Sequence, residues 1–395
     1  MTRIEPVSAH LVGASQAASV VGPAYDVLTP QQRRRISEEN PLSFLRITRS
    51  ASDLPPGTDP AAARLESAEL LRTWIDDGVF EPARPTGFYL YRLSSDGHIQ
   101  TGVVADLHVS DYKRGVVRRH ENTREEKEAE LVAFLRDVGV NSSPVCLTHR
   151  ALGSVDAAVA AGAEELPLLE FETDDEVRHT IWRVDGATGD ELVQAFSSID
   201  ALYLTDGHHR VAAAARFAAE RPEAGRFLAV LFPADQLRIL PYNRCVKVSR
   251  PDLIEVIGRH FEVESASTYE DARPRRRGEF GLYSKGRWWR LIRTELVQPI
   301  AKAADLDVSI LHREVLGPLL ESPNPDFDPR VSYVPGVGGP AALEQRCRAE
   351  GAAGVVLAPT SVEDVMAVSD AGEVMPPKST WFDPKARSGI FVVYR

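Results

Sequence analysis

The run Asp206-Gly207-His208-His209-Arg210 stands between a largely apolar stretch at 199–204 and an alanine-rich stretch at 211–220. The first stretch is typical of a strand and the second of a helix, so these five residues occupy a strand-to-helix turn. The first N–H groups of a helix have no backbone partner, and the helix dipole is positive there. Two histidines and an arginine add donors, which favours a phosphate site formed by Gly207, His208, His209 and Arg210. An ordinary tight turn with Asp206 as the helix cap fits the same pattern.

Composition indicates a soluble globular protein large enough for more than one domain, with 395 residues, 43% of them hydrophobic and 26% charged. The net charge of −11 argues against a protein that binds nucleic acid through bulk electrostatics. Cys146, Cys245 and Cys347 match neither a disulfide framework nor zinc spacing, which indicates a reducing compartment. The N-terminus lacks the apolar core of a signal peptide, and no stretch is long enough to span a bilayer. We therefore expect a cytoplasmic protein without membrane or nucleic-acid partners.

Short strand-like runs alternate with helix-like runs along the whole chain, which predicts a mixed α/β or α+β fold. A new helix follows residue 250, so we divide the chain into regions 1–250 and 251–395. The expected elements are helices at 61–77 (ending at Gly78), 123–139 and 253–261, strands at 227–232 and 354–359, and a hairpin over 87–107 that turns at Asp96-Gly97.

A second polar cluster, Arg118-Arg119-His120-Glu121-Asn122-Thr123, stands at the entrance of the helix expected at 123–139. A glutamate flanked by a histidine and arginines can act as a general base or bind a metal, which makes Glu121 a catalytic candidate with His120 and Asn122 beside it. The alternative is a solvated helix start that is capped by Asn122 or Thr123.

A third cluster lies near the C-terminus, at 375–385, where prolines forbid a helix. Lys378, Ser379, Thr380 and Trp381 offer a cation, two hydroxyls and an indole on a rigid loop, which suits a small zwitterion or a phosphate. The alternative is a surface loop whose Trp381 packs on the core.

Two further polar residues have two interpretations each. Asp26 either caps the short helix that starts near Pro30 or faces the active site, and a structural role is favoured. Arg244 is either a phosphate ligand or the partner of a surface carboxylate. The sequence contains neither a P-loop nor a Gly-x-Gly-x-x-Gly turn at a strand-helix junction, so a nucleotide would be bound by another device.

Taken in order, His120-Glu121, Asp206 to Arg210 and Pro377-Lys378-Ser379-Thr380 resemble the motifs of the free serine kinases of the ParB/sulfiredoxin-like superfamily. Over nearly its whole length the chain also resembles a widespread bacterial family of unknown function that is related to those kinases. This second resemblance rests on the segments 24–27, 40–44, 120–123 with Lys127, 206–210 and 375–385.

The resemblance implies an α+β fold with a ParB/sulfiredoxin-like nucleotide-binding core and N-terminal and C-terminal α/β additions. It implies a kinase that uses ATP or ADP with Mg²⁺ to phosphorylate free L-serine or a related hydroxylated metabolite. In this scheme Glu121 is the base, Asp206 orients the acceptor or the metal, residues 207–210 hold the phosphates, and Lys378, Ser379 and Thr380 hold the acceptor. Trp381 stands where those kinases have a basic residue, which predicts an acceptor with more apolar bulk. The alternative is a nucleotide-gated, ParB-like binding module without kinase activity.

Overall fold

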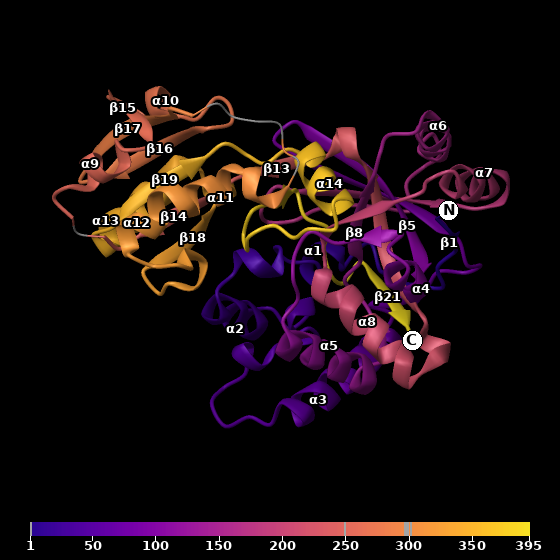
Figure 1. The fold of residues 1–395 in the computed structure, drawn as a ribbon. Helices are drawn as coiled ribbons and strands as arrows, with labels where there is room; N and C mark the ends of the chain where they lie inside the picture. Colours follow the sequence, from indigo (N-terminus) through magenta and orange to yellow (C-terminus); the bar gives the residue numbers. More distant parts are fainter. Residues whose placement is uncertain (1, 249, 296–299, 301) are drawn as a thin grey trace. The chain divides into compact units, whose positions relative to one another are not determined.

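The computed structural model describes residues 2–248, 250–295, 300 and 302–395, and it divides into two compact units (Figure 1). Unit 1 consists of Met1–Leu237 together with Pro384–Arg395, and unit 2 consists of Arg238–Asp383. The boundary predicted after residue 250 therefore falls inside unit 2. The end of the chain belongs to unit 1 because its strand β21 (Phe391–Tyr394) pairs there with β2 (His10–Val12) and β7 (Val140–Asn141).

Unit 1 is built on a nine-stranded mixed sheet, which confirms the mixed α+β class. Most neighbours are antiparallel, but β11 is parallel to β6 and β12 is parallel to β8. Along the sheet the order is β6 (Val117–Arg118), β11 (Leu202–Asp206), β8 (Val145–His149), β12 (Arg226–Pro233), β5 (His98–His108), β4 (Phe88–Ser95), β10 (Arg178–Val184) and β9 (Leu169–Glu172), and β1 (Ile4–Glu5) pairs with β5.

Both faces of this sheet are buried, which explains why β12 is apolar from Phe227 to Pro233. One face packs against α6 (Gly153–Gly162), α7 (Gly186–Ser197) and α8 (His208–Glu220). The other face packs against α3 (Pro60–Asp76) and a four-stranded sheet in the order β3 (Phe80–Pro82), β2, β21 and β7. The helix α5 (Glu125–Asp137) lies beside α8 through an apolar contact between Val132, Leu135, Ala213 and Phe217 (Figure 1).

Local sequence signals account for the predicted elements of unit 1. The α3 helix begins after Asp59, whose side chain accepts a hydrogen bond from the Ala61 N–H, and the chain leaves it through Gly78 at φ +76°. The β4–β5 hairpin turns at Asp96 (φ +51°) and Gly97 (φ +72°), two left-handed residues that a type I′ turn requires. Both predictions are confirmed. The remaining helices of unit 1 are α1 (Ala17–Val20), α2 (Pro30–Glu39) and α4 (Val109–Lys113).

Unit 2 contains a six-stranded sheet and a separate two-stranded ribbon. The sheet order is β15 (Phe261–Ala266), β17 (Arg287–Arg293), β16 (Glu279–Ser284), β19 (Ala353–Leu357), β14 (Tyr242–Val246) and β18 (Val331–Pro335), and the ribbon pairs β13 (Arg238–Leu240) with β20 (Trp381–Asp383). Its helices are α9 (Leu253–Ile257), α10 (Tyr269–Ala272), α11 (Asp307–Leu311), α12 (Gly317–Leu320), α13 (Gly339–Glu350) and α14 (Val362–Asp370).

One expected element of unit 2 is wrong in extent. The helix expected at 253–261 ends at Ile257, and Phe261 instead starts β15. Phe261 is buried against Phe280 of β16 in the same sheet, so tertiary packing decides its conformation. Across the described ranges, no helix combines the length and the apolar character that a membrane crossing requires.

Candidate functional site

Two motifs that are far apart in sequence meet because the strands that precede them are parallel neighbours. Leu202 pairs with Val117 and Tyr203 with Arg118, and the Leu202 N–H donates to the Val116 carbonyl over 2.8 Å. Parallel strands end at the same edge of a sheet. The segment after β6, which contains His120 and Glu121, therefore leaves the sheet beside the turn that follows β11. This pairing brings the first and second predicted clusters together.

The turn after β11 requires a glycine. Gly207 has φ +97° and is the N-cap of α8. A β-carbon at this position would lie 3.0 Å from Nε of Arg210, closer than most real β-carbon contacts. The interpretation of Asp206 as the helix cap is wrong, because Asp206 is the last residue of β11 and its carboxylate contacts other groups. The strand-turn-helix arrangement itself is confirmed.

Asp206 lies between two cations. One oxygen contacts the guanidinium of Arg210, and the other lies 3.2 Å from Nζ of Lys385, which also contacts Asp26. Burial opposes ionisation of Asp206, but Lys385 and Arg210 outweigh it and hold the pKa of this carboxyl well below its usual range. Arg210 also donates to the Pro144 carbonyl over 2.9 Å. Asp206 is therefore a fixed anion whose charge is shared between two basic side chains.

Lys385 is the residue of this network that the sequence analysis did not select. Lys385 is the last residue of the 375–385 run, and it was not one of the candidate site residues chosen from that run. Only the pairing of β21 within unit 1 places it near Asp206, so no local signal in the sequence pointed to it. Asp26 also joins the network through Lys385. Its interpretation as a helix cap is wrong, since Thr29 caps α2 and accepts a hydrogen bond from the Gln32 N–H.

His120, Glu121 and His208 form a compact cluster at the same edge of the sheet. The imidazole rings of His120 and His208 meet edge to face with centroids 4.5 Å apart. A nitrogen of each histidine and an oxygen of Glu121 lie within 4.8 Å of one another. Burial lowers the pKa of His120 to about 4, and burial together with the repulsion that the two rings would exert if both were protonated puts the pKa of His208 well below its usual value. Both histidines are therefore neutral near pH 7.

His209 has a structural role in addition to the phosphate role predicted for it. Its Nε2 accepts a hydrogen bond of 3.0 Å from the backbone N–H of Arg124, which is the N-cap of α5. The interpretation of Asn122 or Thr123 as the cap of this helix is wrong, and Asn122 is exposed. An imidazole from α8 thus satisfies a backbone donor at the start of α5. The histidine ties the two helix entrances together.

The predicted acceptor loop lies in unit 2. Lys378 is exposed at φ +57°, with Nζ 3.4 Å from the hydroxyl of Tyr242, and the Ser379 hydroxyl donates to the Pro376 carbonyl over 2.6 Å. Thr380 is half-buried. Trp381 is only 2% exposed, and its ring packs edge to face on Tyr242 with centroids 5.4 Å apart. This burial agrees with the alternative in which the indole packs on the core.

Arg244 is buried on β14 in unit 2. It donates to the carbonyls of Tyr242 over 2.6 Å and of Lys378 over 3.2 Å, and its guanidinium carbon lies 4.6 Å from the centre of the Tyr333 ring. Burial lowers its pKa to about 10. The interpretation of Arg244 as the partner of a surface carboxylate is therefore wrong. Its hydrogen bond to the Lys378 carbonyl instead holds the backbone of the 378–381 loop in place from within unit 2.

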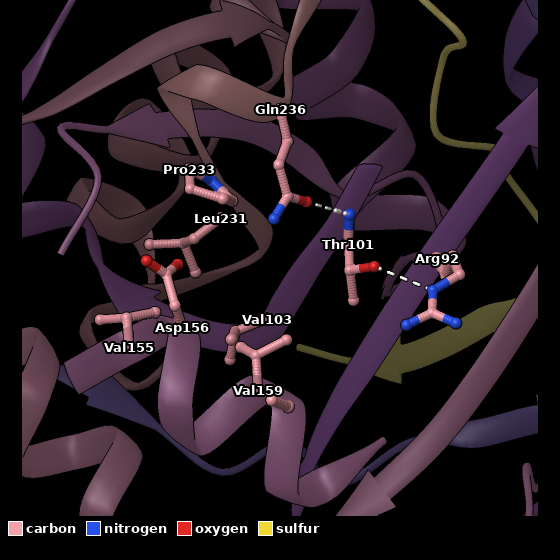
Figure 2. Close-up of a pocket in the computed structure, with 10 residues that line it drawn as sticks. Arg92, Thr101, Val103, Val155, Asp156, Val159, Leu231, Pro233 and Gln236 are labelled. Atoms are coloured by element: carbon pink, nitrogen blue, oxygen red, sulfur yellow. Dashed lines mark hydrogen bonds between the residues drawn. The ribbon is translucent and has the colours of Figure 1, made fainter. Parts of the chain in front are cut away.

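Unit 1 also contains a cavity of about 180 Å³ between β5, β12 and α6 (Figure 2). Thr101 links two other residues that line the cavity. Its N–H donates to the Gln236 side chain over 2.8 Å, and its hydroxyl accepts from Nε of Arg92 over 3.0 Å. The described residues that line it include none of the predicted site residues. The cavity is therefore separate from the predicted site.

The cluster of His120, Glu121 and His208 does not fit the Mg²⁺ that the resemblance implies. In the described part of the chain it is the one group of three side chains whose ligand atoms lie close enough to share an ion. Its donors are two imidazole nitrogens and one carboxylate, whereas Mg²⁺ prefers an octahedron of oxygens. We therefore assign no step of the proposed reaction to Mg²⁺.

Solved structures share a distant likeness with this chain. A free serine kinase in complex with AMP is 15% identical, with 74% of this chain and 91% of that chain covered and a TM-score of 0.40. SbnI with a C-terminal truncation, from Staphylococcus aureus, is 11% identical, with 72% and 85% covered and a TM-score of 0.40. A conserved hypothetical protein from Pyrococcus furiosus is 14% identical, with 74% and 94% covered and a TM-score of 0.37. At these scores the likeness assigns no activity to this chain.

Among proteins of curated function, none matches the sequence. Residues 4–309 match the family model described as "Protein of unknown function (DUF1015)", and the chain therefore belongs to this family.

Proposed function

We propose that the protein is a small-molecule kinase that transfers a phosphoryl group from ATP or ADP to the hydroxyl of free L-serine or a related hydroxylated metabolite. The observation that carries the proposal is the pairing of β6 with β11, which places a glutamate beside the N-terminus of α8. A helix N-terminus offers backbone N–H groups and a positive dipole to phosphate, and a nearby carboxylate can accept the proton of an attacking hydroxyl. Phosphoryl transfer needs these two parts close together.

The charges around the turn support this proposal. Arg210 and Lys385 lie beside the turn, and Asp206 neutralises part of their charge. Fixed cations near a transferring phosphoryl group stabilise the charge that spreads over its oxygens. In the proposal, the amides of residues 207–210 hold the phosphates and Asp206 keeps the two cations in place.

Glu121 is the proposed base, and it takes the proton from the acceptor hydroxyl as that oxygen attacks the terminal phosphorus. The bond from this phosphorus to the bridging oxygen breaks at the same time, so ATP leaves as ADP, or ADP leaves as AMP. The two histidines beside Glu121 are neutral near pH 7, so they do not stabilise its charge as imidazolium ions would. Lys378, Ser379 and Thr380 are the proposed acceptor residues. Trp381 contributes to the proposed acceptor site by packing against Tyr242, whose hydroxyl lies beside the Lys378 amine.

Glu121→Gln tests the proposal because it keeps the shape of the side chain and removes the basic oxygen. We expect turnover of ATP or ADP with a pool of hydroxylated amino acids, followed by phosphorus NMR, to fall by at least about 10²-fold. Nucleotide affinity, measured by calorimetry, should stay unchanged. Glu126→Gln, at an exposed position of the same helix start, is the matched control and should keep full turnover.

Two results would contradict the proposal. Full turnover in Glu121→Gln would remove Glu121 from the reaction. Nucleotide binding by the wild-type protein without turnover of any acceptor in the pool would favour the nucleotide-gated binding module instead.

A further inference from the structure

The cluster of His120, Glu121 and His208 has the ligand chemistry of a metal site that differs from the magnesium site of a kinase. Two imidazoles and one carboxylate are a ligand set that suits zinc, iron and manganese, and three protein ligands leave positions open for water or substrate. We propose that these three residues bind one divalent transition-metal ion of this class.

The geometry of the three side chains is close to that of a site with a bound metal ion. The three ligand atoms lie within 4.8 Å of one another. Ligands about 2.1 Å from a tetrahedral ion lie roughly 3.4 Å apart, so side-chain rotations that move each atom by about 1 Å close the site. His120 and Glu121 come from the segment after β6, and His208 comes from the first turn of α8. The parallel strands β6 and β11 therefore set the separation of the two ligand segments.

His208 provides a second, independent observation. Its side chain is 6% exposed, and its Nε2 is buried without a hydrogen-bond partner among the described residues. A buried ring nitrogen in this state is unfavourable in a native protein unless water or an ion satisfies it. Its neighbours are another buried imidazole and a carboxylate, and that combination attracts a cation rather than an anion.

The surrounding charges are compatible with a cation. Asp206 acts electrostatically on both His120 and His208, so a second carboxylate lies near the ligands. Arg210 and Lys385 are occupied by ion pairs with Asp206. An ionised carboxylate has two oxygens, so metal binding by Glu121 is compatible with the base role proposed above.

The inference does not depend on kinase activity, and it is tested without nucleotide. The 395-residue protein is treated with a chelator and dialysed against Zn²⁺ in millimolar Mg²⁺, and metal content is measured by mass spectrometry. Co²⁺ is titrated in parallel, and its visible absorption reports nitrogen and oxygen ligands. We expect one Zn²⁺ per chain, retained despite the Mg²⁺. His208→Gln and Glu121→Gln should each weaken Zn²⁺ binding by at least about tenfold.

Matched variants test whether Zn²⁺ binding is specific to these residues. His149→Gln changes another buried histidine of unit 1, and Glu126→Gln changes an exposed glutamate near the same helix start. Both should bind Zn²⁺ like the wild type. If His208→Gln fails to fold, Glu121→Gln at its half-buried position decides the result. The proposal is overturned if the wild type binds no stoichiometric Zn²⁺ or Co²⁺, if Mg²⁺ displaces the ion, or if Glu121→Gln binds Zn²⁺ as tightly as the wild type.

Discussion

Gly207→Ala probes the turn on which the whole candidate site depends. The substitution leaves the chemistry of every neighbouring side chain unchanged and adds one methyl group. The residue has φ +97°, where an L-residue is disfavoured by about 1–2 kcal/mol. The new β-carbon would also lie 3.0 Å from Nε and 3.1 Å from the outer nitrogen of Arg210 that contacts Asp206.

The expected loss of stability follows from these contacts. The guanidinium has to move by a few tenths of an ångström, which weakens a partly exposed ion pair that contributes up to about 1 kcal/mol. Alanine has less conformational freedom than glycine in the unfolded chain, and this difference offsets about 0.4–1 kcal/mol of the lost stability. The net expectation is a destabilisation of about 1.5 kcal/mol. Because Asp206 loses part of its contact with Arg210, nucleotide affinity should fall as well.

Urea denaturation followed by circular dichroism measures the change. The two compact units can unfold separately, so hydrogen exchange of the segment 202–217 is measured alongside to assign the loss to unit 1. Gly153→Ala is the matched control. It lies at the start of α6, has no positive φ and has nothing within 4 Å of a new β-carbon, so its stability should stay the same or rise by up to about 1 kcal/mol. Equal stability of Gly207→Ala and the wild type would refute the account of this turn.

Two further predictions concern buried charges. Burial raises the pKa of Asp307 to about 6 from 3.8, so the folded protein holds this proton more tightly than the unfolded chain does. The resulting stabilisation of unit 2, up to about 3 kcal/mol, is fully present below about pH 4 and is lost as the pH rises through 6. Urea midpoints of Asp307→Asn and the wild type should therefore diverge between pH 4 and 6, and parallel curves would contradict the shift. Arg33→Met leaves Asp53 as a buried charge without its 2.7 Å partner, which should cost about 3–5 kcal/mol, whereas the exposed Arg35→Met should change the thermal midpoint little. Similar midpoints for the two arginine variants would show that the buried pair is not stabilising.

The sequence by itself determined the local elements that have strong short-range signals. Asp96-Gly97 predicts the hairpin because both residues tolerate left-handed backbone, and Gly78 predicts the end of α3 for the same reason. The strand-turn-helix at 202–220 was predicted from an apolar run, a glycine and an alanine-rich stretch. These signals act over a few residues, so no distant partner is needed to interpret them.

Capping was predicted less well, because a helix start is decided by whichever donor or acceptor lies nearest in space. The backbone N–H of Arg124 is satisfied by His209 from another helix, and Asp206 is drawn to Arg210 and Lys385 rather than to the N-terminus of α8. A list of residue types favoured at helix caps does not contain this information.

Tertiary structure alone decided which of the candidate residues meet. His120 and Glu121 lie beside His208 only because β6 pairs in parallel with β11, and Lys385 reaches Asp206 only because β21 pairs with strands near the start of the chain. Trp381, which the sequence offered as a wall of the acceptor site, is instead buried against Tyr242. Each of these outcomes depends on strand pairing or core packing between distant segments, and such pairing depends on the whole sheet rather than on any local run of residues.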